Sequence, residues 1–197
     1  MKARQKIIPF ILMLTLVAGV GCKTDEVVLQ LEVNSQTPVI QKKVAGINFR
    51  FSLLKARYQP STVFKEMDNI IFSFSIENAL QDTIFVSTDF ITPDFYRVFK
   101  SDHIDMGKPW TGLWCDYSLA KEELAIAPSN LKEINCPWVL ASNIRPDYPL
   151  CMSQSQSYLR TGDYYTFINL GFYYRISNKP RSIENLKFLI NFRVTNN

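Results

Sequence analysis

Hydrophobic and polar residues alternate with a period of two along most of this 197-residue chain. In residues 70–77, isoleucine and phenylalanine fill the even positions, and the odd positions include two serines and a glutamate. Such alternation predicts β-strands with one face on a core and one on solvent, as in antiparallel sheets. The pattern predicts strands at residues 27–33, 47–52, 70–77, 84–89, 95–99, 164–170 and 188–194.

Turn-forming residues separate these segments. The clearest turn signals are Asn78–Asp82, Gly107–Pro109, Pro128–Asn130, Thr161–Asp163 and Asn178–Pro180. Many short strands spaced by turns predict an all-β fold, an immunoglobulin-like antiparallel β-sandwich. Only residues 119–124 have a briefly helical pattern, and residues 142–157 are polar and aperiodic, which predicts a long loop. Because the sequence shows no internal repeat and no change in composition that would mark a domain boundary, residues 27–197 are expected to form one domain.

The segment Leu159–Tyr164 reads Leu-Arg-Thr-Gly-Asp-Tyr and looks like a tyrosine corner. In that motif a tyrosine at the start of a late strand donates a hydrogen bond to upstream backbone. We assign this role to Tyr164. The alternative is that Tyr164 is an ordinary core tyrosine.

The first 21 residues read as a bacterial lipoprotein signal peptide that ends before Cys22. Lys2, Arg4 and Lys6 form a basic start, and an apolar run of roughly 14 residues follows from Ile7. A membrane-spanning helix needs about 20 apolar residues, so a permanent span is the weaker interpretation. Small residues precede Cys22, which is therefore predicted to carry lipid and become the mature N-terminus.

This junction resembles a lipobox, with one departure. Gly19 stands where Leu, Val or Ile is usual, as in the looser lipoboxes of Bacteroidetes-type bacteria. Residues 22–26 then form a lipidated tether, in which Lys23, Asp25 and Glu26 resemble an export signal to the outer leaflet of the outer membrane. The alternatives are a solvated linker on the periplasmic face, and an ordinary cysteine after a conventional signal peptide.

Charge excludes one class of partner. The chain has 22 basic and 18 acidic residues, and without the three basic residues of the signal peptide the count is 19 against 18. No basic run interleaved with aromatic residues remains, so the sequence has no nucleic-acid footprint. Abundant aromatic residues (13%) and only 7 glycines favour a packed domain over disorder.

Three cysteines remain if Cys22 carries lipid, namely Cys115, Cys136 and Cys151. An exported protein reaches a compartment that permits disulfides, and three cysteines allow one bridge and one free thiol. Cys136 and Cys151 are the preferred pair, because both flank loop-like sequence. The alternative is three buried free thiols.

No pattern predicts catalysis, a metal or a cofactor. The sole histidine, His103, has acidic neighbours at Asp102 and Asp105, but side chains at such loop spacings rarely converge into the three or four ligands of a zinc site. No Gly-x-Ser-x-Gly elbow is present, and no glycine-rich loop could cradle a phosphate. We therefore expect a protein that is not an enzyme.

One segment is rich in aromatic residues that could contact a ligand. Trp110, Trp114 and Tyr117 lie within eight residues of one another, and exposed aromatic rings anchor sugars and protein partners. The alternative is that these rings close one end of the sandwich, which is favoured for Trp114. Trp138, beside Pro137, is expected in the core.

Several segments, in this order, resemble the immunoglobulin-like domain of the bacterial intracellular proteinase inhibitor family. They are Ile70–Ile76, Asp94-Phe95, Lys108–Trp110, Leu124–Pro128 and Leu159–Tyr164. The resemblance covers about residues 60–175 and departs from the family at Pro128-Ser129, where a Pro-Gly turn is usual. It implies the fold more than inhibition. The whole chain is also similar to small immunoglobulin-like lipoproteins of Bacteroidetes-type bacteria, which implies a cell-surface location.

Three functions follow as hypotheses. The first is a monomeric, lipid-anchored module on the outside of the outer membrane that binds an extracellular glycan or protein. The second is an accessory subunit of a surface glycan-uptake or pilus-like complex. The third is a proteinase inhibitor that acts through an exposed loop at residues 142–157. A glycan binder should show an exposed aromatic platform, and an assembly subunit should show an uncovered sheet edge.

Overall fold

The computed structural model describes residues 37–114, 123–140, 146–147, 150–153 and 156–196, with the backbone alone for residues 110–114 and 151–153. In this part of the chain the regular elements are strands β1 to β13 and two short 3-10 turns, η1 (Ala56–Tyr58) and η2 (Thr88–Phe90). The predicted all-β sandwich is confirmed. The predicted strand at residues 27–33 lies outside the described residues.

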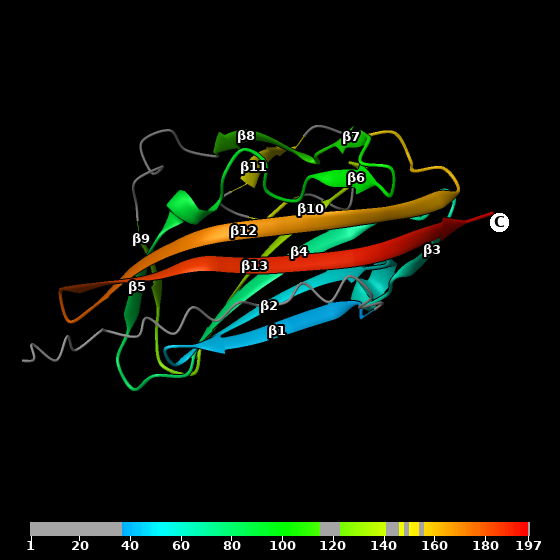
Figure 1. Ribbon diagram of the computed structural model, residues 1–197. Helices are drawn as coiled ribbons and strands as arrows, with labels where there is room; N and C mark the ends of the chain where they lie inside the picture. The colour runs from blue at the N-terminus through cyan, green and yellow to red at the C-terminus, as the bar shows by residue number, and fades with distance from the viewer. Residues whose placement is uncertain (1–36, 115–122, 141–145, 148–149, 154–155, 197) are drawn as a thin grey trace, which may run out of the picture. The chain divides into compact units, whose positions relative to one another are not determined.

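Two sheets form the layers of the fold (Figure 1). The first, sheet A, is antiparallel with the order β1-β2-β4-β10. Its strands are Val39–Val44 (β1), Ile47–Leu54 (β2), Ile71–Asn78 (β4) and Leu131–Pro137 (β10). Phe74 of β4 lies opposite Phe51 of β2 on one side and Ile134 of β10 on the other. Alternate residues thus form rows across the sheet, and every second row faces the core.

The second layer, sheet B, is built around the long hairpin of β12 and β13. Its path runs β3-β13-β12-β5-β9, while β6 pairs with β12 and β7 pairs with β6. The strands are Val63–Lys65 (β3), Ile84–Ser87 (β5), Val98–Lys100 (β6), Asp105–Gly107 (β7), Glu123–Ile126 (β9), Gly162–Ile176 (β12) and Lys179–Thr195 (β13). Only the β3–β13 pairing is parallel among these. A separate pair joins β8 (Trp110–Trp114) to β11 (Leu150–Ser153).

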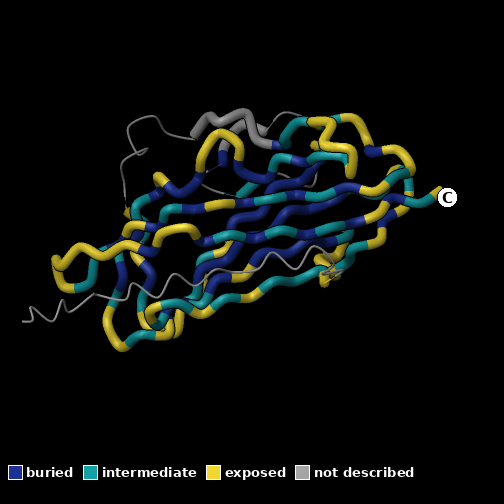
Figure 2. The backbone as a smooth tube through the Cα atoms, viewed as in Figure 1, coloured by how far each residue is buried: buried dark blue, intermediate teal, exposed yellow. Residues whose placement is uncertain are grey.

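Aromatic rings from both sheets meet in the core between them. The ring of Phe74 in sheet A lies 5.6 Å from that of Phe188 in sheet B, edge to face. It also packs against Phe90 of η2 at 5.8 Å. Phe49 of β2 meets Phe172 of β12 at 4.8 Å, again edge to face. Such pairs stabilise beyond the area that they bury, and Figure 2 shows the buried positions concentrated along these strands.

The β12–β13 hairpin separates an inner from an outer face. Tyr164, Thr166 and Ile168 are buried, and the residues between them are partly or fully exposed. Phe192 of β13 pairs with Tyr164, and both face the core. The next residue pair along the hairpin, Tyr165 with Asn191, consequently faces outward.

Three predicted segments differ from the structure. The strand expected at residues 95–99 begins only at Val98, because Phe95 closes a turn on Thr92 and Tyr96 has a left-handed φ of 66°. The described end of the helical pattern at residues 119–124 belongs to strand β9, which pairs with β5. The loop expected at residues 142–157 contains strand β11, since Leu150 and Met152 pair with β8.

Cys136 corrects the predicted disulfide with Cys151. It is a free thiol, fully buried among the hydrophobic side chains of the core. Burial raises the pKa of this thiol far above its usual range, because a thiolate would lose its hydration there. The preferred pairing was wrong for a physical reason: Cys136 lies on an inward-facing position of β10, where its side chain is buried in the core.

An aspartate occupies the outer edge of β10, the end strand of sheet A, at one residue. Asp147 donates its backbone N–H to the carbonyl oxygen of Asn135 in β10 at 2.8 Å. Its carboxylate accepts the backbone N–H of Asn135 at 3.1 Å and the side-chain amide at 2.9 Å. The edge groups of β10 at this point are therefore occupied within the chain.

The predicted tyrosine corner is present. The hydroxyl of Tyr164 donates to the backbone carbonyl of Arg160 at 2.7 Å, and the Tyr164 ring stacks on Phe192 at 5.5 Å. The bond ties the chain entering β12 to the start of that strand. Burial raises the pKa of the Tyr164 hydroxyl, which remains a neutral donor.

Replacing Tyr164 by phenylalanine tests this bond. Tyr164→Phe keeps the stacked ring and removes the donor to Arg160, so the free energy of unfolding should fall by about 1 kcal/mol, the usual net value of one such bond. Urea unfolding measures it. Tyr173→Phe is the matched control on the same strand, since Tyr173 is 50% exposed. Equal stability of the two variants would show that the corner bond is unimportant.

Candidate functional site

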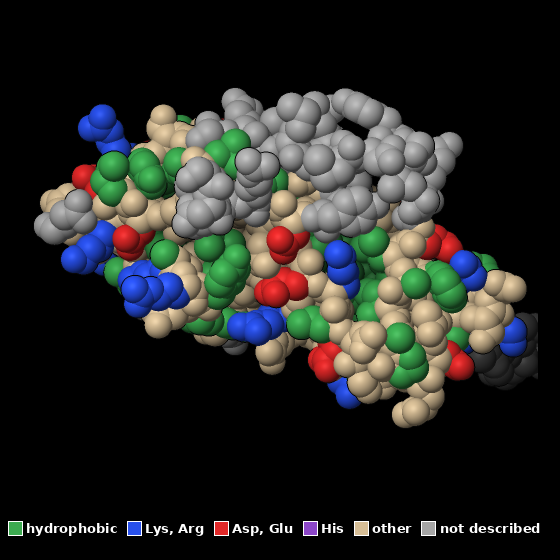
Figure 3. Space-filling view, turned by 180° about the vertical axis from the view of Figure 1, so that it is seen from behind, with side chains coloured by type: hydrophobic (Ala, Val, Ile, Leu, Met, Phe, Trp, Pro, Cys, Tyr) green, Lys and Arg blue, Asp and Glu red, His purple; other side chains and the backbone are tan. Residues whose placement is uncertain are grey.

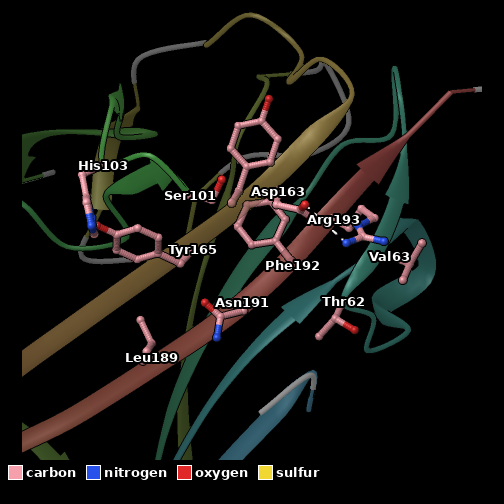
Figure 4. A pocket seen from close by; sticks show the side chains of 11 residues that line it. Thr62, Val63, Ser101, His103, Asp163, Tyr165, Leu189, Asn191, Phe192 and Arg193 are labelled. Atoms are coloured by element: carbon pink, nitrogen blue, oxygen red, sulfur yellow. Dashed lines mark hydrogen bonds and ion pairs between the residues drawn. The ribbon is translucent and has the colours of Figure 1, made fainter. Parts of the chain in front are cut away.

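A groove of about 670 Å³ lies along the outer face of the β12–β13 hairpin (Figure 4). Its floor comes from Asp163 and Tyr165 of β12 and from Leu189, Asn191 and Arg193 of β13. Two other segments form its sides, residues 62–63 at the start of β3 and residues 101–103 in the turn between β6 and β7. The groove therefore combines aromatic, aliphatic and hydrogen-bonding side chains on paired strands.

Strand register fixes the order of these side chains. Asp163 lies opposite Arg193, and two residues further along Tyr165 lies opposite Asn191. On the other side of Tyr165 is Phe99 of β6. Two residues along a strand correspond to about 7 Å, so the charged pair and the aromatic pair are within reach of one ligand.

Tyr165 is the centre of an aromatic cluster. Its ring stacks on Phe99 with centroids 5.2 Å apart and planes at 18°. His103 meets Tyr165 edge-on at 5.8 Å, and its Nδ1 shares a hydrogen bond with the Tyr165 hydroxyl at 2.9 Å. Figure 4 shows the two side chains pointing toward each other. These contacts hold the Tyr165 ring in one orientation.

His103 itself is held by the β6–β7 turn. The backbone N–H of His103 donates to Lys100 at 2.8 Å, and His103 has a φ of 66°. The backbone N–H of Ser101 donates to the carbonyl of Asp163 on β12 at 2.9 Å. The turn is thus fastened to the strand that carries Tyr165.

The other half of the groove holds an ion pair between β12 and β13. Arg193 donates from Nε to Asp163 Oδ1 at 2.6 Å and from Nη2 to Oδ2 at 3.3 Å. The hydrogen bond to Asp163 raises the pKa of Arg193. Both side chains are more than half exposed, 62% for Arg193 and 54% for Asp163. A planar donor and a planar acceptor are therefore presented side by side to solvent.

This arrangement is suited to binding. Among the described residues no group of three or more His, Cys, Asp or Glu side chains is placed to hold a metal ion. The hydrogen-bond partner of His103 within the groove is the phenol of Tyr165, and Ser101 contributes no side-chain bond to it that the structure shows. A fixed ring face beside oriented polar groups is the usual composition of a small-ligand site.

A second, more polar hollow of about 500 Å³ lies on sheet A, lined by Arg50, Ser75 and Glu77 among others. Asn48 donates to Glu77 at 2.9 Å there. Figure 3, the view from behind Figure 1, shows acidic and basic side chains interspersed with hydrophobic ones. No exposed aromatic pair is found in the lining of this second hollow, so the groove on sheet B is the better candidate.

The residues singled out in the sequence have mixed outcomes. Trp138 is buried as predicted, and its Nε1 donates to the carbonyl of Ser157 at 2.9 Å. Trp110 and Trp114 lie at the ends of β8, and their side chains are outside the described part of the structure. Cys22 and Tyr117 are outside the described residues altogether. The predicted contact patch and lipidation site therefore stay predictions.

The inhibitory loop gains no support from the described residues. Within residues 142–157, β11 is paired with β8, and Asp147 is bonded to β10. The backbone N–H of Gln156 donates to the carbonyl of Trp138 at 3.1 Å. These parts of the stretch are hydrogen-bonded to the rest of the domain.

The groove was not predicted from the sequence, although the sequence contains one sign of it. Alternation placed Tyr164 and Ile168 on the core face of a strand, but Tyr165 and Phe167 on the opposite face are aromatic as well. A strand that is apolar on both faces needs a second contact surface. His103 had been considered as a metal ligand, whereas the structure places it against Tyr165.

No protein-family model matches this chain, and no curated protein matches it in sequence. The resemblances noted in the sequence accordingly stay predictions. Across the residues that the structure describes, there is no helix with the length and apolarity needed to span a bilayer.

The groove ion pair should be dispensable for folding. Arg193→Gln removes a partner that is largely in solvent, where ion pairs contribute little, so the midpoint of thermal unfolding should not change. The adjacent Phe192→Ala removes a buried ring of the same strand and should cost about 3 to 5 kcal/mol. Calorimetry on both variants checks the contrast. A large loss of stability in Arg193→Gln would mean that the pair is structural.

Proposed function

We propose that this protein is a non-enzymatic binding module, anchored by lipid on Cys22 to the outer membrane and facing the cell exterior. The observation that carries the binding role is the groove on sheet B, where an oriented aromatic ring and a half-exposed ion pair share one surface. The anchor is inferred from the sequence around Cys22.

Three features of the groove support binding. Its floor lies on β12 and β13, which are paired with each other along 14 residue pairs, so the ligand-facing positions are rigid. Its inward neighbours Tyr164 and Phe192 belong to the core and support it from below. The exposed ion pair of the groove contributes little to the stability of the fold, so its two side chains are available for contacts with a ligand.

The non-enzymatic role is supported by what surrounds the sole histidine. General acid–base catalysis needs a group within hydrogen-bond reach of a reacting atom and a partner that orients it. The partner of His103 Nδ1 is the phenol of Tyr165, whose ring stacks on Phe99, and no carboxylate among the described residues is hydrogen-bonded to His103. This arrangement immobilises an aromatic surface.

The anchor can be tested with Cys22→Ser. The natural chain should incorporate a radiolabelled fatty acid and sediment with outer membranes, because several acyl chains hold a protein stably on a bilayer. Cys22→Ser should lose both the label and the membrane association, whereas Cys115→Ser should keep them. Incorporation of label into Cys22→Ser would contradict the assignment of the lipidated residue.

The groove can be tested by a screen that is blind to ligand class. The full chain is heated with oligosaccharides, peptides, nucleotides and lipids in turn, and a ligand is recognised by a rise in the unfolding temperature. The double variant Tyr165→Ala with Asp163→Asn should abolish that rise.

The matched control for this screen is the double variant Tyr173→Ala with Glu123→Gln. It removes an exposed tyrosine of β12 and an acid that is paired with Arg175 at 2.7 Å, both on sheet B away from the groove. Ligand stabilisation should persist in this control. If no compound class gives a groove-dependent rise, the proposed function is wrong.

A further inference from the structure

We infer that the groove on sheet B is a saccharide site, in which a sugar ring stacks on Tyr165 while its hydroxyls bond to Asp163 and Arg193. This inference rests on the proposed binding function and gives it a ligand class. The site was not among the residues expected from the sequence, which pointed to Trp110, Trp114 and Tyr117.

The aromatic half of the groove fits the apolar face of a sugar. The face of an aromatic ring is negative. The C–H hydrogens on one side of a pyranose carry partial positive charge and are attracted to that face. Tyr165 is held by Phe99 at 5.2 Å and by the hydrogen bond shared with His103 Nδ1 at 2.9 Å, so the ring does not need to be ordered when the ligand binds. Leu189 extends the same apolar floor on β13.

The charged half fits the hydroxyl groups. A carboxylate only accepts hydrogen bonds and a guanidinium only donates them, whereas each sugar hydroxyl does both. Asp163 and Arg193 lie side by side, with Nε and Oδ1 2.6 Å apart. Two neighbouring hydroxyls can therefore donate to Asp163 and accept from Arg193 without breaking the pair. Because the ion pair already orients both side chains, they lose less conformational entropy when a ligand binds.

Charge and pairing argue against the other ligand classes. The carboxylate of Asp163 offsets the charge of Arg193, so a phosphate group would meet no net positive field. An extended peptide that added a strand beside Tyr165 would need an open edge. At Tyr165, however, β12 is paired on both sides, with Phe99 of β6 and Asn191 of β13.

Glycan arrays carrying bacterial, plant and animal oligosaccharides test the assignment, with the labelled full chain as the probe. The oligosaccharide that gives the strongest signal is then titrated by calorimetry. Tyr165→Ala should weaken its binding about tenfold or more, the value of one good aromatic contact. Asp163→Asn should weaken it by a similar factor, since a neutral amide is a weaker acceptor than a carboxylate and no longer pairs with the charge of Arg193.

Tyr165→Phe keeps the ring and should bind within about threefold of the natural chain, which separates stacking from the loss of a folded groove. The controls Tyr173→Ala and Glu123→Gln should bind unchanged. The inference is overturned if no oligosaccharide binds, or if the bound one is insensitive to Tyr165→Ala. The inference is also overturned if a peptide or a lipid raises the unfolding temperature in the thermal screen and the groove variant abolishes that rise. The protein would then still be a binding module.

Discussion

The packing of aromatic rings between the two sheets is the constraint on which the rest of the structure depends. Phe74 stands in the middle of it, with Phe188 from the opposite sheet and Phe90 from a 3-10 turn around its ring. Each ring can reach its partners only if its strand keeps the observed register, because a slip by one residue would turn it to solvent. The core therefore determines which side chains of β12 and β13 point outward, and so determines the composition of the groove.

That dependence explains how binding and stability can be separated in this molecule. Tyr164 and Tyr165 are neighbours in the chain, but the first donates to Arg160 and closes a turn, while the second meets His103 on the surface. Arg193 and Phe192 show the same division on β13, where one is in solvent and the other in the core. Outward-facing residues of the hairpin can thus be substituted to suit a ligand, because the inward-facing residues maintain the fold.

Much of the fold could be predicted from the sequence, because alternation and turn residues are local signals. Strands β2, β4, β5, β12 and β13 and the bond of Tyr164 belong to this class. Strand β11 could not be predicted, since Leu150 is placed by its pairing with β8, a contact distant in the sequence. The same holds for Cys136, which was expected to flank a loop but is buried in strand β10, where its pairing with Phe72 of β4 places it. The groove depends on the register of four segments, which a single sequence does not reveal. The only sign of the groove in the sequence is the pair of aromatic residues on the outer face of β12.

Asp147 has a consequence for the way in which two copies of this protein can meet. A lipid-anchored protein diffuses in two dimensions, where its copies collide in a shared orientation far more often than they would in bulk solution. Strand β10 ends sheet A, and an open strand edge is a template for pairing with another copy. By occupying the N–H and carbonyl of Asn135, Asp147 removes that template at one point of the edge. Asp147 thus hinders edge-to-edge pairing of two copies at this position, an effect that matters most under the proposed lipid anchor.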